Sequence, residues 1–325
     1  MKASRDQRSV AGGCAHRRVS RLVAWLVVAL GAARAAPARA ELKVVATVPA
    51  LAAIAKEIAG PAAEVKSLTR SSQDPHFVDA RPSLALDLNR ADLLLAVGLE
   101  LEVGWLPTLL TGARNREIMT GGRGYLDCSQ FVHLQDVHTR PVDRSMGDIH
   151  PSGNPHYLAD PRAAAMVAKG IATRLEALDP SHQAAYEKGL GTFLGRLEAA
   201  RAGWEKRLAP FRGAHVVAYH MTWAYVAEWI GLDVVGFLEP KPGIPPNPSH
   251  VVQLLAVARQ AKVKAVLQEE YYPDTTSRLV AERVPAVLVK VPGGPDYQAG
   301  QKYVDYVERL VTLLEQGLKG ARSGS

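Results

Sequence analysis

The chain has 325 residues and a formal net charge of +7, and the excess of positive charge lies in its first 40 residues. These hold eight of the 39 Lys and Arg residues and one of the 32 acidic residues, so residues 41–325 keep 31 of each and no formal net charge. This balance gives no support for binding to nucleic acid or to an anionic membrane. The remaining length, about 285 residues, suits two domains better than one.

Residues 1–40 have the layout of a cleavable secretory signal peptide. A basic head ends at Arg21, an apolar run follows over residues 22–33, and the small-residue sequence Ala38-Arg39-Ala40 comes last. The apolar run is shorter than the roughly 18 residues that span a bilayer, which favours a signal peptide over a membrane anchor. We therefore expect cleavage before Glu41 and a periplasmic protein.

Cysteine chemistry contributes little to the expected exported chain. Cys14 precedes the apolar run, so it is poorly placed as a lipidated N-terminal cysteine. Cys128 is then left alone and cannot form an intramolecular disulfide. A metal site in this protein should therefore rest on imidazole and carboxylate ligands.

Residues 41–179 are expected to form an N-terminal α/β lobe. Apolar runs typical of buried strands alternate with helical segments that are bounded by Gly or Pro. The predicted strands are 42–47, 64–68 and 92–97, and the predicted helices are 51–58, 82–89 and one that begins at Pro161. Such alternation implies a mainly parallel sheet with helices on both faces.

Residues 180–209 are predicted to form a linking helix. Apolar residues recur at helical intervals from Tyr186 to Trp204, and Pro180 and Pro210 bound the segment. At ~1.5 Å per residue this helix is roughly 40 Å long, which is enough to cross from one lobe to another.

Residues 210–325 are expected to form a C-terminal α/β lobe of the same kind. The predicted strands 215–219, 234–237, 265–268 and 286–291 alternate with the predicted helices 222–230, 248–261, 275–283 and 303–318. The connection 236–248 is dense with proline and carries Glu239 and Lys241. We interpret it as an ordinary stiff connection, with a docking loop as the alternative.

Four residues that are far apart in the sequence are the candidate metal ligands: His76, His156, His220 and Glu269. The first two each follow a proline, in Asp74-Pro75-His76 and Asn154-Pro155-His156, and the restricted backbone lowers the entropy lost on ordering the site. His220 and Glu269 are the first residues beyond predicted strands, and ligands of open α/β sheets collect at such strand ends. Together these residues would place a metal in the cleft between the lobes.

Three alternatives are open at this site. Asp296 and a water molecule compete with Glu269 for the fourth ligand position, and His150 is either an auxiliary ligand or an exposed residue. Three protein ligands and a water would also suit a secreted zinc hydrolase, with Glu269 or Glu270 as the base. The sequence lacks a His-Glu-x-x-His motif, which argues against such an enzyme.

The ordered motifs of residues 41–325 resemble those of a known family. They are Asp74-Pro75-His76, 89–94, 98–102, 153–157 with Asp160-Pro161, and Tyr219-His220 with 223–225 and Gly231-Leu232. Together they resemble the metal-specific solute-binding proteins of bacterial ABC importers, the zinc/manganese group of periplasmic metal-binding lipoproteins and adhesin-like proteins. This resemblance implies two pseudo-symmetric lobes joined by one long rigid helix, with little hinge closure and a metal at the interface.

The resemblance also implies a ligand set and a function. Three histidine positions of the family match His76, His156 and His220, and a histidine rather than a Glu at the third position favours zinc over manganese. The family's fourth ligand, usually an Asp near the end of a late strand, has no counterpart in residues 288–293.

The implied protein is a non-enzymatic periplasmic monomer that captures Zn²⁺ as its transported ligand. It would deliver the ion to an ABC permease in the inner membrane, and a periplasmic metal chaperone is a second candidate partner. Manganese or iron is the alternative cargo.

Overall fold

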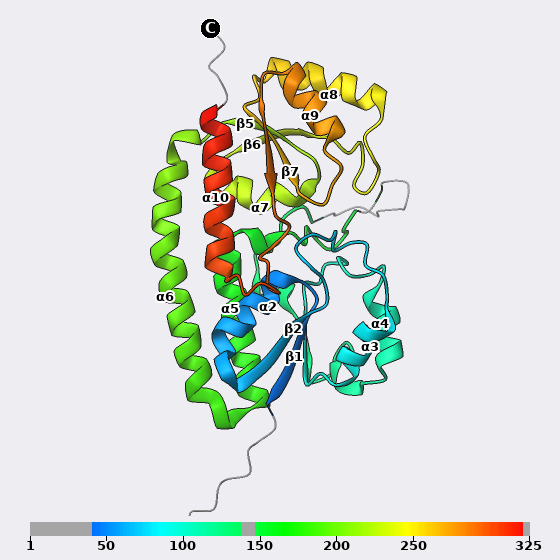
Figure 1. The fold of residues 1–325 in the computed structure, drawn as a ribbon, viewed down its shortest axis with the longest axis vertical. Coiled ribbons are helices and arrows are strands. Elements are labelled where there is room, and N and C mark those ends of the chain that lie inside the picture. Colours follow the sequence, from blue (N-terminus) through cyan, green and yellow to red (C-terminus); the bar gives the residue numbers. More distant parts are fainter. Residues whose placement is uncertain (1–40, 138–146, 148, 321–325) are drawn as a thin grey trace, which may run out of the picture. The chain divides into compact units, whose positions relative to one another are not determined.

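Within the residues that the structure describes, eight strands form two parallel sheets with the same strand order. The two sheets lie in separate lobes (Figure 1). The computed structural model describes residues 41–137, 147 and 149–320. One sheet has the order β2-β1-β3-β4 and the other has the order β6-β5-β7-β8, so the second lobe repeats the topology of the first. This arrangement confirms the predicted α/β fold with two pseudo-symmetric lobes.

The N-terminal lobe buries its sheet between two layers of helices. Its elements are β1 (Leu42–Ala46), α2 (Pro49–Ala59), β2 (Ala63–Ser67), α3 (Pro82–Asn89), β3 (Leu93–Ala96), α4 (Leu106–Ala113), β4 (Tyr125–Asp127) and α5 (Pro161–Leu178). Val44 lies in the same apolar core as α2 and α5, whereas the next residue, Val45, lies in the core of α3 and α4. Because successive side chains of a strand point to opposite faces, both faces of this sheet are covered.

The sequence pattern did not predict α4 or β4. The helix has Pro107 near its start and Gly112 near its end, so few residues of it follow a helical pattern. The strand has three residues, of which only Leu126 is buried. The Pro and Gly residues therefore obscure the helical pattern of α4, and β4 is too short to show an alternating pattern.

The C-terminal lobe is built in the same way. Its elements are β5 (His215–Ala218), α7 (Ala224–Ile230), β6 (Asp233–Phe237), α8 (Pro248–Gln260), β7 (Ala265–Glu269), α9 (Thr275–Arg283), β8 (Val287–Val291) and α10 (Tyr303–Gly320). Val217 and Val266 pack with α8 and α9, and the opposite face of the sheet joins the core of α7 and α10. Glu269, predicted to follow the strand, is its last residue.

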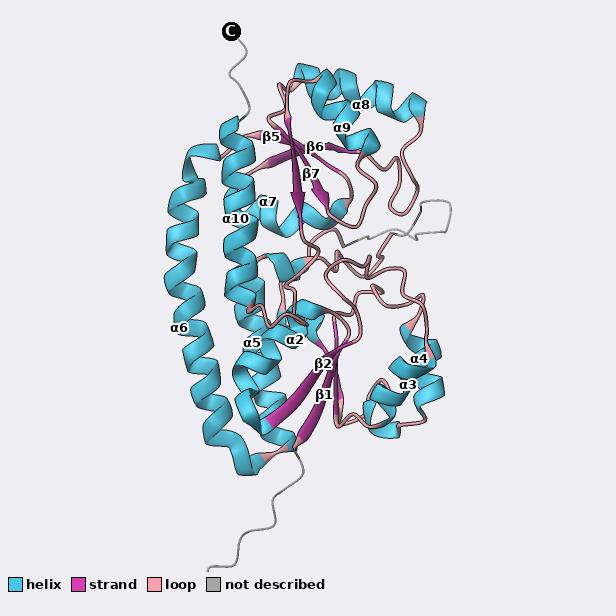
Figure 2. Cartoon of the chain, viewed as in Figure 1, coloured by secondary structure: helices cyan, strands magenta, loops and turns pink. Residues whose placement is uncertain are grey.

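The predicted linking helix is α6 (Gln183–Leu208), whose 26 residues run beside both lobes (Figure 2). A Cβ at Gly189 would overlap the carbonyl oxygen of Ile58, so glycine allows α6 to approach α2 closely. At the other end, Nε1 of Trp204 donates a 2.7 Å hydrogen bond to Glu308 of α10. A single apolar core includes residues of α2, α5, α6, α7 and α10. The lobes are therefore joined by a common core rather than by a flexible hinge.

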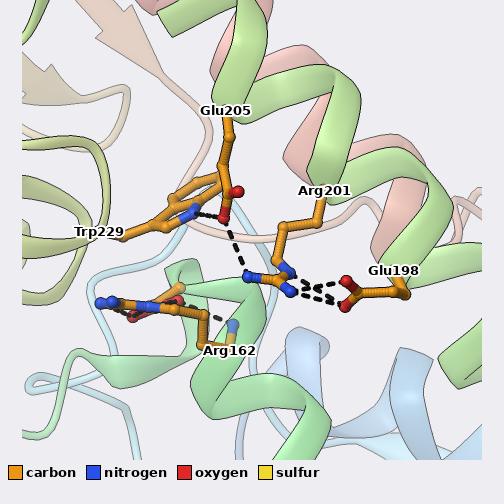
Figure 3. Close-up of polar contacts among 6 residues, drawn as sticks. Arg162, Glu198, Arg201, Glu205 and Trp229 are labelled. Atoms are coloured by element: carbon orange, nitrogen blue, oxygen red, sulfur yellow. Dashed lines mark hydrogen bonds and ion pairs between the residues drawn. The ribbon is translucent and has the colours of Figure 1, made fainter. Parts of the chain in front are cut away.

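Polar contacts also fasten α6 where it passes from one lobe to the other (Figure 3). Glu205 accepts a 3.0 Å hydrogen bond from Nε1 of Trp229 in α7 and forms a 3.0 Å ion pair with Arg201. Arg201 also pairs with Glu198 at 2.7 Å. The bond from Trp229 holds α7 against the C-terminal part of α6, and the two Arg201 ion pairs lie within α6 itself.

Residues 1–40, the predicted signal peptide, lie outside the described residues, and the lobe boundaries at 179 and 209 stay predictions. Across the part of the chain that is described, none of the helices combines the length and the apolarity that crossing a membrane requires.

Candidate metal centre

Four histidines of the described residues converge between the two sheets. His76 lies in the loop between β2 and α3, His150 and His156 lie in the connection between β4 and α5, and His220 closely follows β5. All of them therefore come after the carboxyl ends of parallel strands, where the loops of α/β proteins build ligand sites.

The ring nitrogens of these histidines lie at separations that one ion can bridge. Nε2 of His76 lies 3.3 Å from Nε2 of His150, and Nε2 of His156 lies 3.2 Å from Nε2 of His220. The ring centroid of His76 is 5.1 Å from the centroids of His156 and His220. The structure thus brings the three predicted histidines together and adds His150, which completes a group with ligand atoms of His76 and His156 within 4.8 Å of one another.

Two carboxylates orient two of the rings. Nδ1 of His76 donates to Oδ1 of Asp74 at 2.8 Å, and Nδ1 of His220 donates to Oε2 of Glu239 at 2.6 Å. A proton held on Nδ1 leaves the lone pair on Nε2 free for a metal. Burial opposes the charge on Asp74, but its hydrogen bonds from His76 hold the pKa of this carboxyl below its ordinary value.

Burial keeps the other two rings neutral. The pKa of His156 lies well below its ordinary value, chiefly because the ring is buried and then because His220, His76 and His150 surround it. Burial, together with nearby His76 and His220, lowers the pKa of His150 to about 3. At neutral pH both rings can therefore accept a cation without first losing a proton.

The two carboxylates proposed for the fourth position differ in their surroundings. Glu269 is buried, and neither of its carboxylate oxygens has a hydrogen-bond partner among the described residues. It lines a cavity of about 60 Å³ together with His156 and Tyr271, and burial raises its pKa to about 7. Asp296 is exposed, and its Oδ1 accepts a hydrogen bond from the backbone nitrogen of Ala299 in its own turn.

Sequence comparison places the chain in a family. Residues 44–317 match the family described as zinc-uptake complex component A, periplasmic. The chain belongs to this ZnuA family. It is therefore an extracytoplasmic, metal-binding solute-binding protein of an ABC importer, and a divalent metal is its transported ligand. This membership decides against the zinc hydrolase considered from the sequence.

Relatives of this ZnuA-family protein are named for different metals. The manganese ABC transporter substrate-binding lipoprotein PsaA of Streptococcus pneumoniae is 26% identical over 247 residues, which cover 74% of this chain and 76% of PsaA. The high-affinity zinc uptake system protein ZnuA of Paracoccus denitrificans is 30% identical over 229 residues, covering 64% of this chain and 70% of that protein. The solved structure of the solute-binding protein FpvC of Pseudomonas aeruginosa with Mn²⁺ has a TM-score of 0.72 at 22% identity and covers 87% of this chain and 100% of its own.

Two residues of the site were not assigned from the sequence. The sequence alone does not decide whether His150 is an auxiliary ligand or an exposed residue, although its neighbour Pro151 repeats the pairing of His with Pro seen at His76. Glu239 was considered only as part of a proline-dense connection. Nothing in the sequence pairs it with His220, because the two residues come from different strand ends that the fold brings together.

Proposed function

We propose that this ZnuA-family protein captures Zn²⁺ between its lobes and delivers it to the permease of its ABC importer. The observation that carries the proposal is the spacing of the ring nitrogens. Nitrogen ligands of tetrahedral zinc lie ~2.0–2.1 Å from the ion, which puts neighbouring nitrogens about 3.3 Å apart. The two Nε2 pairs, at 3.3 Å and 3.2 Å, match that separation.

The donor set supports zinc over the alternative cargo, manganese or iron. Imidazole nitrogen suits Zn²⁺, whereas Mn²⁺ prefers harder ligands that are rich in oxygen. The cluster offers four imidazoles among the described residues, including His220 at the position where manganese binders tend to carry Glu. The name of PsaA and the Mn²⁺ complex of FpvC keep manganese as the second candidate.

We propose His76, His156 and His220 as three of the ligands, with two contenders for the fourth. The 3.3 Å separation from His76 favours His150. The orphaned, buried oxygens of Glu269 support Glu269, because buried polar atoms in native proteins nearly always have partners. We favour His150 as the fourth ligand. Glu269, which lines the cavity beside His156, is the alternative.

The setting of this function follows from the sequence prediction. Residues 1–40 would direct the chain to the periplasm and be removed, and the remaining chain would act as a monomer. Its partners would be the inner-membrane permease and, as a second candidate, a periplasmic metal chaperone. Because both lobes contribute ligands, contact with the permease that disturbs either lobe would weaken the site and release the ion.

Metal analysis tests the proposal directly. Protein isolated from the periplasm without added metal should carry one zinc ion per chain, and competition titration should show manganese binding weaker by orders of magnitude. Protein that carries manganese and keeps it in the presence of equimolar zinc would overturn the zinc assignment. Binding of neither metal would overturn the site.

A further inference from the structure

Glu239 is a buried residue that contacts His220 of the candidate metal centre but is not itself one of the proposed ligands. Its backbone nitrogen donates to the carbonyl oxygen of Tyr219 at 3.2 Å, which continues the pairing of β6 with β5 and brings Glu239 beside His220. The residue is 8% exposed, so few water molecules can solvate its carboxyl group. A buried carboxylate needs hydrogen-bond donors, and the two donors of Glu239 indicate what it does.

One oxygen of Glu239 serves two partners in different parts of the protein. Oε2 accepts from Nδ1 of His220 at 2.6 Å and from the backbone nitrogen of Gly243 at 3.2 Å. The second donor belongs to the turn Lys241-Pro242-Gly243-Ile244, which is closed by a 3.0 Å bond from Ile244 nitrogen to the Lys241 oxygen. Pro at its second position and Gly at its third, with φ 75° at Gly243, fit a type II turn.

This turn connects the metal centre with the protein surface. Pro242 lines a cavity together with His150, His156 and His220. A Cβ at Gly147 would overlap the Pro242 carbonyl oxygen, so the turn also lies against the segment that carries His150. On its outer side Ile244 is 46% exposed and lines a second cavity, of about 730 Å³, that reaches His76.

We propose that Glu239 is a positioning residue that couples His220 to the turn 241–244, so that displacement of this turn at the surface speeds release of the metal. Carboxylates that accept from a ligand imidazole fix its tautomer and orientation and raise its basicity. The Gly243 nitrogen in turn fixes the carboxylate. Movement of the turn would leave Glu239 free to rotate and His220 without its anchor. This inference rests on the proposed function, in which His220 binds zinc.

Four variants test the coupling in the full exported chain. Glu239→Ala removes the acceptor, and Glu239→Gln keeps an oxygen that can accept from Nδ1 of His220. Gly243→Val strains the turn, because a β-branched residue is unfavourable at the positive φ of this position. Gly213→Val is the matched control, since Gly213 has φ 76° and open space around the position where its Cβ would be, on a connection remote from the site.

Zinc release to a chelator, followed by stopped flow, and the visible absorption of bound Co²⁺ are the readouts. We expect Glu239→Ala to bind zinc ~10–100-fold more weakly and to shift the Co²⁺ bands, with most of the affinity restored in Glu239→Gln. Gly243→Val should release zinc several-fold faster and shift the same bands, whereas Gly213→Val should match the wild type in both.

Wild-type release rates and Co²⁺ bands in Gly243→Val, or equal losses in the Ala and Gln variants, would overturn the coupling. Equal effects of the two Gly→Val changes would also overturn it, because general strain would then explain both. If Glu239→Ala does not fold, as judged by circular dichroism, Glu239→Gln and the two Gly→Val variants still test the coupling. A His220→Ala variant that binds zinc like the wild type would instead overturn the proposed function.

Discussion

The two lobes share a topology but hold the histidines of the candidate metal centre in different ways. In the N-terminal lobe, Asp74 lies two residues before His76, and its Oδ1 accepts from both the backbone nitrogen and Nδ1 of that histidine. In the C-terminal lobe, His220 is held by Glu239, which is 19 residues away and on another strand end. One histidine is therefore ordered by its own loop, and the other by the packing of the sheet.

The lobes also differ in the donors that they bring. Among the described residues, the N-terminal side supplies the imidazoles of His76, His150 and His156, while the C-terminal lobe supplies His220 and the buried carboxylate of Glu269. Because three of the four imidazoles come from the N-terminal lobe, that lobe can hold most of the site in place before the metal binds. The C-terminal lobe then completes the site. The C-terminal lobe is thus the side where small movements should change affinity most.

The largest expected effect comes from removing an imidazole on either side. His76→Ala and His220→Ala should each weaken zinc binding by more than ~100-fold, since loss of a ligand should exceed the 10–100-fold cost of losing a residue that supports one. Isothermal titration with a competing chelator measures this. His215→Ala is the control, because His215 begins the strand that His220 follows, and it should bind zinc normally. Near-wild-type binding in both site variants would refute the assignment.

A smaller effect should show which lobe provides the fourth ligand. We expect His150→Ala to cost about tenfold or more in zinc affinity and Glu269→Gln to cost less, because a water molecule can replace a carboxylate that is not required. The same titration compares the two variants. The reverse order would assign the fourth position to Glu269 and to the C-terminal lobe, and no change in either variant would leave that position to solvent.

The sequence predicted the features that depend on neighbouring residues better than the contacts that depend on the tertiary fold. The paired sequences Asp74-Pro75-His76 and Asn154-Pro155-His156 pointed to two histidines that the structure brings together, and His220 was found from its place after an apolar strand. Strand and helix periodicity likewise predicted the two-lobed fold and its long helix, whereas Pro107 and Gly112 obscure the helical pattern of α4 and β4 has only three residues. Glu239 could not be predicted, because its partner is set by the neighbouring positions of β5 and β6 in the sheet.

Acidification should change the contributions of His150 and Glu269 to the stability of the metal-free protein in opposite directions. The pKa of His150 is lowered to about 3, so between pH 6.5 and that value only the unfolded chain takes up this proton, and the metal-free protein loses stability as pH falls. The pKa of Glu269 is raised to about 7, so below that value the folded chain binds its proton first and gains stability down to about pH 4.5. Each group contributes at most ~1.4 kcal/mol per pH unit.

Thermal unfolding of metal-free variants between pH 7 and pH 5 checks these signs. Glu269→Gln should lose melting temperature more steeply than the wild type on acidification, because the opposing contribution is gone. His150→Ala should lose it less steeply. Identical slopes in all three proteins would show that neither group has a shifted pKa in the folded chain.

The smallest effect is expected where α6 passes between the lobes. Arg201 pairs with Glu198 and Glu205 on the helix surface, and its side chain and that of Glu198 are 28% and 67% exposed. Water screens such pairs, so Arg201→Ala should cost less than ~1 kcal/mol in the free energy of unfolding and leave zinc affinity unchanged. Trp204→Ala, in the core beneath, should cost about 3–5 kcal/mol by urea unfolding. A loss of zinc affinity in Arg201→Ala would mean that α6, and not the common apolar core, sets the spacing of the ligands in the two lobes.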